Sequence, residues 1–246
     1  MILIHIPHSS INVPKEFRDQ FIIDDSELNK EVRLMADLFV DRLVENIDEE
    51  KIIFPISRIV CDVERFRDDK DEEMARQGMG VVYTKRHDLG PLRKKGVDAE
   101  KIKSDLYDKH HAVFESKVNN MLENYGKCFI IDLHSYSDRP LAYELHPKEK
   151  RPDICLGFDE FHIDRELVER IKQLCELAGY EVSYNEPFKG SIVPLSAYRK
   201  DKRIRSLMIE INKRTYLKGF QSVPERFEKL KQLISDLIAE IKDFYK

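Results

Sequence analysis

The sequence is poor in the features that would place it outside the globular proteins. It has only nine glycines in 246 residues, and no apolar run approaches the ~18 residues that a transmembrane helix requires. The first residues, MILIHIPHSS, lack the basic segment and small-residue cleavage site of a signal peptide. A collagenous, disordered or membrane-spanning chain is therefore excluded at this stage.

Paired cysteines are absent as well. The four cysteines are scattered and form no CxxC pair, which disfavours a cysteine zinc site: Cys61, Cys128, Cys155 and Cys175. Cys61 and Cys128 lie within apolar runs, as buried thiols of a reducing compartment do. We expect a cytoplasmic protein.

The charge balance has no large surplus of either sign. Lys and Arg number 42 and Asp and Glu 46, for a formal net charge of -4, and 36% of residues are charged. This composition gives no global attraction to nucleic acid or to an anionic membrane. We expect neither as a partner, and a small molecule as the ligand.

The chain length and the hydrophobic pattern favour one α/β domain spanning residues 1–246. The pattern predicts strands at 2–6, 51–55, 57–63, 127–133, 181–184 and 205–211. It predicts helices at 25–47, 99–125, 163–178 and 224–244, and a charged surface excursion at 67–80. Strands that alternate with helices indicate a mixed, mostly parallel central sheet flanked by helices.

Three of these strands end in polar side chains. His5 and His8 accompany the first strand, His134 follows the strand at 127–133, and Glu210 lies between two isoleucines of the late strand. Functional sites of open α/β sheets form where the carboxyl ends of strands converge. Two histidines, a carboxylate and a separate glutamate are the parts of a hydrolytic zinc centre.

Each of these residues also has a purely structural interpretation. His8 could cap a loop, and Asp132 and His134, which share one face of their strand, could be a satisfied core pair. Glu210 could face outward on an edge strand rather than meet a cation. Arg65 suits an anionic substrate or a local salt bridge, and Asp37 suits a solvated helix face.

Eight segments together resemble one known family, in the same order along the chain. They are HIPHSS, ADLFVDRL, SRIVCDVERF, GVVYTK, IIDLHSYS, RPDICLGF, NEPFKGS and LMIEINKRTY. They are similar to segments of the N-formylglutamate amidohydrolase family, from His5 to about Leu217. That family in turn resembles the zinc carboxypeptidases and the group of aspartoacylase and succinylglutamate desuccinylase. The resemblance implies a zinc-exopeptidase-like fold of the phosphorylase/hydrolase-like kind.

The resemblance also implies roles for individual residues. His8 and His134 would be ligands of one zinc ion, Glu210 the general base, and Arg65 the clamp for a substrate carboxylate. The carboxypeptidases carry a glutamate three residues after the first histidine, where this chain has Ile11. Asp37 is the preferred third ligand, with Asp62 and Asp132 as alternatives and Asp132 favoured as a partner that orients a histidine.

The implied reaction is zinc-dependent hydrolysis of the amide bond of a small N-acyl amino acid, such as N-formyl-L-glutamate. Lys189 or Arg203 would help Arg65 to hold a carboxylate, and Tyr83 would donate to the developing oxyanion. Glu64 stands where related proteins carry asparagine, and as a neighbour of Arg65 it would favour a neutral or cationic substrate side chain. The alternatives are a metallopeptidase or deacylase acting on peptides, and a metal-free binding protein.

Overall fold

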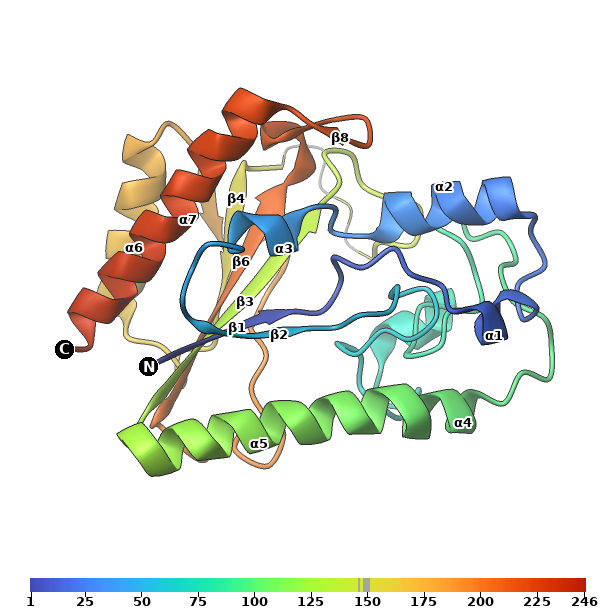
Figure 1. Ribbon diagram of the computed structural model, residues 1–246, viewed down its shortest axis with the longest axis horizontal. Helices are drawn as coiled ribbons and strands as arrows, with labels where there is room; N and C mark the ends of the chain where they lie inside the picture. Colours follow the sequence, from blue (N-terminus) through green and yellow to red (C-terminus); the bar gives the residue numbers. More distant parts are fainter. Residues whose placement is uncertain (146, 148–150) are drawn as a thin grey trace.

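A six-stranded sheet forms the centre of the computed structural model, which describes residues 1–145, 147 and 151–246 (Figure 1). The strand order is β2-β1-β3-β6-β4-β5. All neighbouring pairs are parallel except β4 and β6, which are antiparallel. The strands are β1 (Ile2–Ile6), β2 (Glu50–Ile53), β3 (Cys128–Tyr136), β4 (Ile154–Gly157), β5 (Val182–Tyr184) and β6 (Ile204–Asn212). The prediction of a mixed, mostly parallel sheet in a single α/β domain is confirmed.

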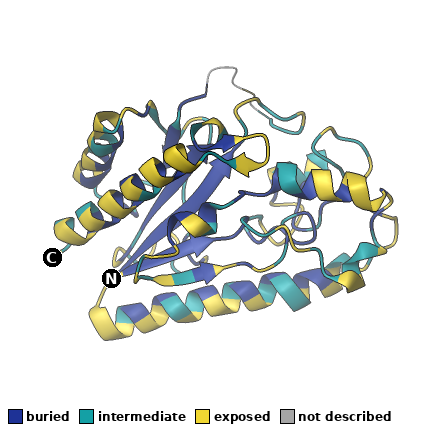
Figure 2. Cartoon of the chain, turned by 45° about the horizontal axis from the view of Figure 1, so that its top comes forward, coloured by how far each residue is buried: buried dark blue, intermediate teal, exposed yellow. Residues whose placement is uncertain are grey.

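Helices cover both faces of this sheet. The long helix α5 lies on one face, and α3, α6 and α7 lie on the other (Figure 1). Their bounds are α3 (Val40–Leu43), α5 (Asp108–Tyr125), α6 (Arg165–Leu177) and α7 (Pro224–Phe244). Each of these helices turns its apolar side to the strands and its charged side to solvent, and the sheet between them is buried (Figure 2).

The remaining elements gather beyond the carboxyl ends of the parallel strands. They are α1 (Lys15–Arg18), α2 (Asp25–Met35), α4 (Ala99–Ile102), the 3₁₀ turns Glu73–Gln77 and Lys213–Thr215, and the hairpin of β7 (Leu217–Lys218) and β8 (Gln221–Ser222). The π-helical turn Lys103–Tyr107 joins α4 to α5, so the predicted helix at 99–125 is present as one continuous helical stretch.

The predicted helix at 25–47 is wrong in its middle. Helix α2 ends at Met35, Ala36 is extended, and Phe39 has a left-handed φ of 65° before α3 begins. The amide of Asp37 donates to the carbonyl of His8 at 2.9 Å, which pulls this residue out of helical geometry. Asp37 is therefore no solvated helix residue: it is 1% exposed and lies in the break between two helices.

The predicted strand at 57–63 is also wrong, although its residues are as buried as the pattern suggested. The segment forms tight turns, in which the amide of Val60 donates to the backbone carbonyl of Ser57 at 2.9 Å. The guanidinium of Arg93 donates to the carbonyls of Ile59 and Val60 at 2.7 and 3.1 Å. A side chain thus satisfies backbone groups that a strand neighbour would otherwise bind.

The other predicted strands and helices are present, with small shifts of their ends, and the prediction missed the short helix α1 and the strands β4, β7 and β8. The excursion at 67–80 lies partly at the surface, but Glu72 and Met79 within it are buried. All four cysteines are free and buried, including Cys61 and Cys128, for which burial was predicted. No helix in the described ranges combines the length and the apolar character needed to cross a membrane.

Candidate metal centre and catalytic cavity

The strand register brings the predicted polar residues together at one edge of the sheet. His5 on β1 lies opposite Asp132 on β3, and His134 on β3 lies opposite Glu210 on β6. Because β1, β3 and β6 run parallel, their carboxyl ends share this edge. The expected convergence of strand ends is what the structure contains.

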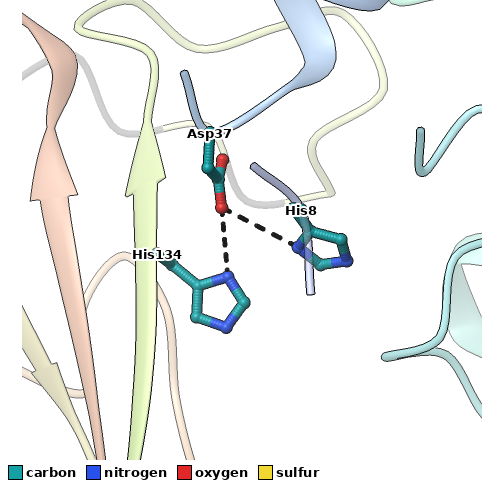
Figure 3. Close-up of side chains that lie close together, drawn as sticks. All are labelled: His8, Asp37 and His134. Carbon is teal, nitrogen blue, oxygen red and sulfur yellow. Dashed lines mark hydrogen bonds and ion pairs between the residues drawn. The ribbon is translucent and has the colours of Figure 1, made fainter. Parts of the chain in front are cut away.

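His8, Asp37 and His134 form a compact group that could hold a metal ion (Figure 3). The Asp37 Oδ2 atom lies 3.2 Å from Nδ1 of His134 and 3.8 Å from Nδ1 of His8. All three residues are buried, and they come from the end of β3, the loop after β1 and the break between α2 and α3. Two imidazoles and one carboxylate make a three-ligand set that leaves a fourth position open, as in catalytic zinc sites.

The far side of each imidazole ring faces carboxylates. Nε2 of His8 lies 2.8 Å from Asp62, and Nε2 of His134 lies 3.0 Å from both Asp132 and Glu64. A carboxylate only accepts, so these contacts place a proton on each Nε2. Once Nδ1 of His134 has lost its own proton, the Nδ1 lone pairs of both rings would be available to a metal ion. Metal-binding histidines in proteins have this arrangement, in which an outer acid fixes the tautomer.

Nδ1 of His8 and Oε2 of Glu210 are among the buried atoms that have no hydrogen-bond partner within the described residues. A buried polar atom without a partner costs free energy, and in a native site it indicates a missing ion or water. The residues therefore fit a divalent metal at the histidines, with a glutamate oxygen free beside it.

Electrostatics act in opposite directions on the two histidines of this group and raise the pKa of the neighbouring glutamate. Burial alone lowers the pKa of His134, but Glu64 and Asp132 outweigh it and hold this pKa well above its ordinary value. Burial raises the pKa of Glu210 to about 8. Burial and the nearby Arg58 lower the pKa of His8, which keeps its imidazole neutral.

A second group of possible ligands, His5, Glu64 and Asp132, has a different character. Nδ1 of His5 already lies 3.0 Å from Asp132, and Nε2 lies 2.9 Å from His110. Burial lowers the pKa of His5, but Asp132 and Glu64 raise it to about 9. Because both of its nitrogens have these contacts, His5 helps to position Asp132 and Glu64, the acids that orient His134.

Cationic side chains line the same cavity. Arg65 donates from Nε to the carbonyl of Met79 at 3.1 Å, and its nearest ion-pair partner is Asp62 at 3.5 Å. Lys189 lines the cavity too and is exposed. Glu64, expected to counteract Arg65, points its carboxylate at His5 and His134 instead.

The structure does not bring two predicted residues to the cavity. The hydroxyl of Tyr83 is fully buried and donates to Asp62 at 2.6 Å, so it has no proton for an oxyanion. Arg203 precedes β6 at the opposite edge of the sheet and pairs with Asp201 on the surface. Neither side chain lines the cavity.

The cavity also contains residues that the sequence analysis left out. Arg58 pairs with Asp62 at 2.8 Å, and Lys213 reaches the carbonyl of Leu34 at 3.0 Å. Burial lowers the pKa of Lys213, and among the described residues no carboxylate lies within ion-pair distance of its Nζ atom. Both residues lie within the quoted family motifs, but a single basic residue in such a motif does not by itself indicate that it lines a cavity.

A buried cluster of histidines and acids at the carboxyl edge of a mostly parallel sheet, with a free glutamate oxygen beside it, defines a hydrolase built on an α/β scaffold. The profile of the family described as N-formylglutamate amidohydrolase matches residues 1–217. The chain belongs to this family, whose enzymes are hydrolases of carbon–nitrogen bonds other than peptide bonds and act on small molecules.

Two solved structures share the fold across nearly the whole chain. One is an N-formylglutamate amidohydrolase from Ralstonia eutropha JMP134, with a TM-score of 0.81, 21% identity, and coverage of 99% of this chain and 93% of that one. The other is a gene product from Agrobacterium tumefaciens, with a TM-score of 0.69, 17% identity, and coverage of 98% and 91%. No curated protein sequence matches the chain.

Proposed function

We propose that the protein is a zinc-dependent amidohydrolase that cleaves the amide bond of a small N-acyl amino acid, with N-formyl-L-glutamate as the first substrate to test. The observation that carries this proposal is that two buried atoms beside Asp37 and His134, Nδ1 of His8 and Oε2 of Glu210, have no hydrogen-bond partner among the described residues. A protein that only bound a small molecule would not need a free carboxylate oxygen, able to accept a proton, beside a group of metal-binding side chains.

His8, Asp37 and His134 would hold one zinc ion. When bound there, zinc polarises the acyl carbonyl and lowers the pKa of a water molecule to about 7. Other divalent ions also suit a nitrogen and oxygen site of this kind. Asp62, Asp132 and Glu64 keep the imidazoles in the required tautomer.

Glu210 would act as the general base. Its free Oε2 accepts a proton from the attacking water and passes it to the leaving nitrogen, which completes hydrolysis to a carboxylic acid and an amine. Arg65 would bind the carboxylate of the amino acid, assisted by Lys189 and by Lys213, whose Nζ atom donates to the carbonyl of Leu34. Tyr83 and Arg203 have no part in this proposal.

The test is hydrolysis of N-formyl-L-glutamate by the zinc-loaded protein, compared with Glu210→Gln. We expect the substitution to reduce kcat by about 10²–10⁴-fold while zinc content by elemental analysis stays the same. Glu31→Gln is the matched control, because Glu31 is also buried but accepts hydrogen bonds from His87, outside the cavity. Full turnover by Glu210→Gln with zinc bound would refute the general-base role.

A further inference from the structure

Four tyrosines among the described residues line the cavity, and they differ in what their hydroxyl groups contact. Three of the hydroxyls donate to protein oxygens at distances of 2.5 to 2.9 Å, and they belong to Tyr107, Tyr136 and Tyr198. The hydroxyl of the fourth, Tyr143, has no hydrogen-bond partner in the described part of the chain. Tyr143 therefore offers the cavity a hydroxyl that a bound ligand can use.

The turn that carries Tyr143 is fixed beside the sheet. The amide of Leu141 donates to Oε1 of Glu144 at 2.9 Å, and the amide of Glu144 donates to the carbonyl of Leu141 at 3.0 Å. Glu144 also pairs with Arg151, which is buried and donates to the carbonyl of Ser137, directly after β3, at 2.8 Å. The ring of Tyr143 packs against an apolar cluster that includes residues of α2. These contacts give the side chain a set position in the cavity wall.

The charges around this hydroxyl suit an anionic ligand. Burial raises the pKa of Tyr143, so the phenol stays protonated near neutral pH and can donate. The guanidiniums of Arg58 and Arg65 oppose this shift, and their effect is larger than that of the Asp37 carboxylate. The hydroxyl is therefore a neutral donor in a part of the cavity where two guanidiniums dominate the electrostatics.

Arg65 leaves room for a second donor to the same ligand. Its Nε atom donates to the carbonyl of Met79 at 3.1 Å, and its two Nη atoms make no hydrogen bond within the described residues. A carboxylate has about four lone-pair sites, of which a guanidinium takes two. We propose that the hydroxyl of Tyr143 donates a hydrogen bond to the substrate carboxylate that Arg65 binds. Tyr143 is then a further substrate-binding residue, and this inference rests on the proposed amidohydrolase function.

The test is Tyr143→Phe, which removes only the hydroxyl. We expect KM for N-formyl-L-glutamate to rise about 10–100-fold. We expect kcat to stay nearly unchanged, because the carboxylate is bound equally in the ground state and the transition state. Tyr198→Phe is the matched control: Tyr198 lines the same cavity, but its hydroxyl donates to Asp159, so both constants should keep their wild-type values. An unchanged KM in a Tyr143→Phe protein that hydrolyses the compound would overturn the inference and leave the proposed function intact.

Free L-glutamate separates this role from a contact with the reacting carbonyl, because it has the carboxylates but no acyl group. Tyr143→Phe should raise its constant for competitive inhibition by about the same factor as KM. If the variant impairs hydrolysis while L-glutamate inhibits it as well as it inhibits the wild type, the hydroxyl contacts the acyl oxygen and the assignment to the carboxylate is refuted.

Calorimetric binding to the zinc-loaded Glu210→Gln protein covers the case in which the compound is not hydrolysed. Adding Tyr143→Phe to this protein should weaken the binding of N-formyl-L-glutamate about 10–100-fold. That result would support the inference even though the proposed reaction had failed. Equal affinity with and without the hydroxyl, or no binding of the compound to either protein, would overturn it.

Discussion

Two buried histidines at opposite edges of the same sheet show how structural and functional polar groups differ. His162, at the edge where β6 begins, is 1% exposed, accepts a hydrogen bond from the Arg199 amide at 2.8 Å and reaches the carbonyl of Ile204 at 2.9 Å. His8, at the other edge, is 2% exposed, but its Nδ1 atom has no hydrogen-bond partner in the described part of the chain. Burial is equal, so the difference lies in whether every polar atom is satisfied.

The apolar core provides the same contrast on a larger scale. Behind β3 and β6, the residues of α6 and α7 form one continuous apolar cluster. In front of the carboxyl edge, acids and imidazoles are packed at similar depth. Burial of the first group stabilises the fold through the hydrophobic effect. The second group costs desolvation free energy, which a bound cation would offset. Substitutions should separate these two regions.

We expect the largest difference between the two regions when His134 and His162 are each replaced by alanine in separate variants. His134→Ala should abolish zinc binding and turnover, because it removes a ligand. His162→Ala should retain about one zinc per chain but lose roughly 1–3 kcal/mol of stability, because it leaves buried backbone groups unpaired. Elemental analysis and denaturant unfolding measure both quantities. Zinc retained in His134→Ala at wild-type level would contradict the ligand assignment.

A substitution in the core should have the opposite signature. Leu237 on α7 is completely buried in the apolar cluster. Leu237→Ala should reduce the free energy of unfolding by about 2–5 kcal/mol, with kcat/KM nearly unchanged at a temperature where the variant is folded. A large loss of kcat/KM in a folded Leu237→Ala protein would mean that core and site are coupled, and the two-region comparison would fail.

The smallest expected effect is the release of protons when zinc binds. The carboxylates around His134 outweigh its burial and raise its pKa, so the metal-free protein carries a proton there near neutral pH. A zinc ion must displace that proton, so binding should release protons and the apparent affinity should increase as pH rises. Calorimetry at pH 7 in two buffers of different ionisation enthalpy measures the number released.

Glu64→Gln sharpens this measurement, because it removes one of the carboxylates that raise the pKa of His134. The variant should release fewer protons than the wild type. A binding enthalpy that is independent of the buffer would show that no proton is displaced, and the assigned electrostatics of the site would be wrong.

Much of this architecture is readable from the sequence because it depends on local patterns. The apolar runs that became β3 and β6 need burial on both faces, whatever their neighbours are. Polar residues at their ends mark the edge where a site forms, and the ordered motifs point to the amidohydrolase family. His8, His134, Glu210 and Arg65 were predicted in this way, and all four line one cavity.

The tertiary structure decided what depends on distant partners. Asp37 leaves its helix because its amide binds the His8 carbonyl, and residues 57–63 turn instead of pairing because Arg93 binds their carbonyls. The roles of Glu64, Tyr83 and Arg203 likewise depend on which groups lie beside them. The hydrophobic pattern of the sequence predicts which residues are buried. Which residue pairs with which across the fold is set by the long-range contacts that close the chain.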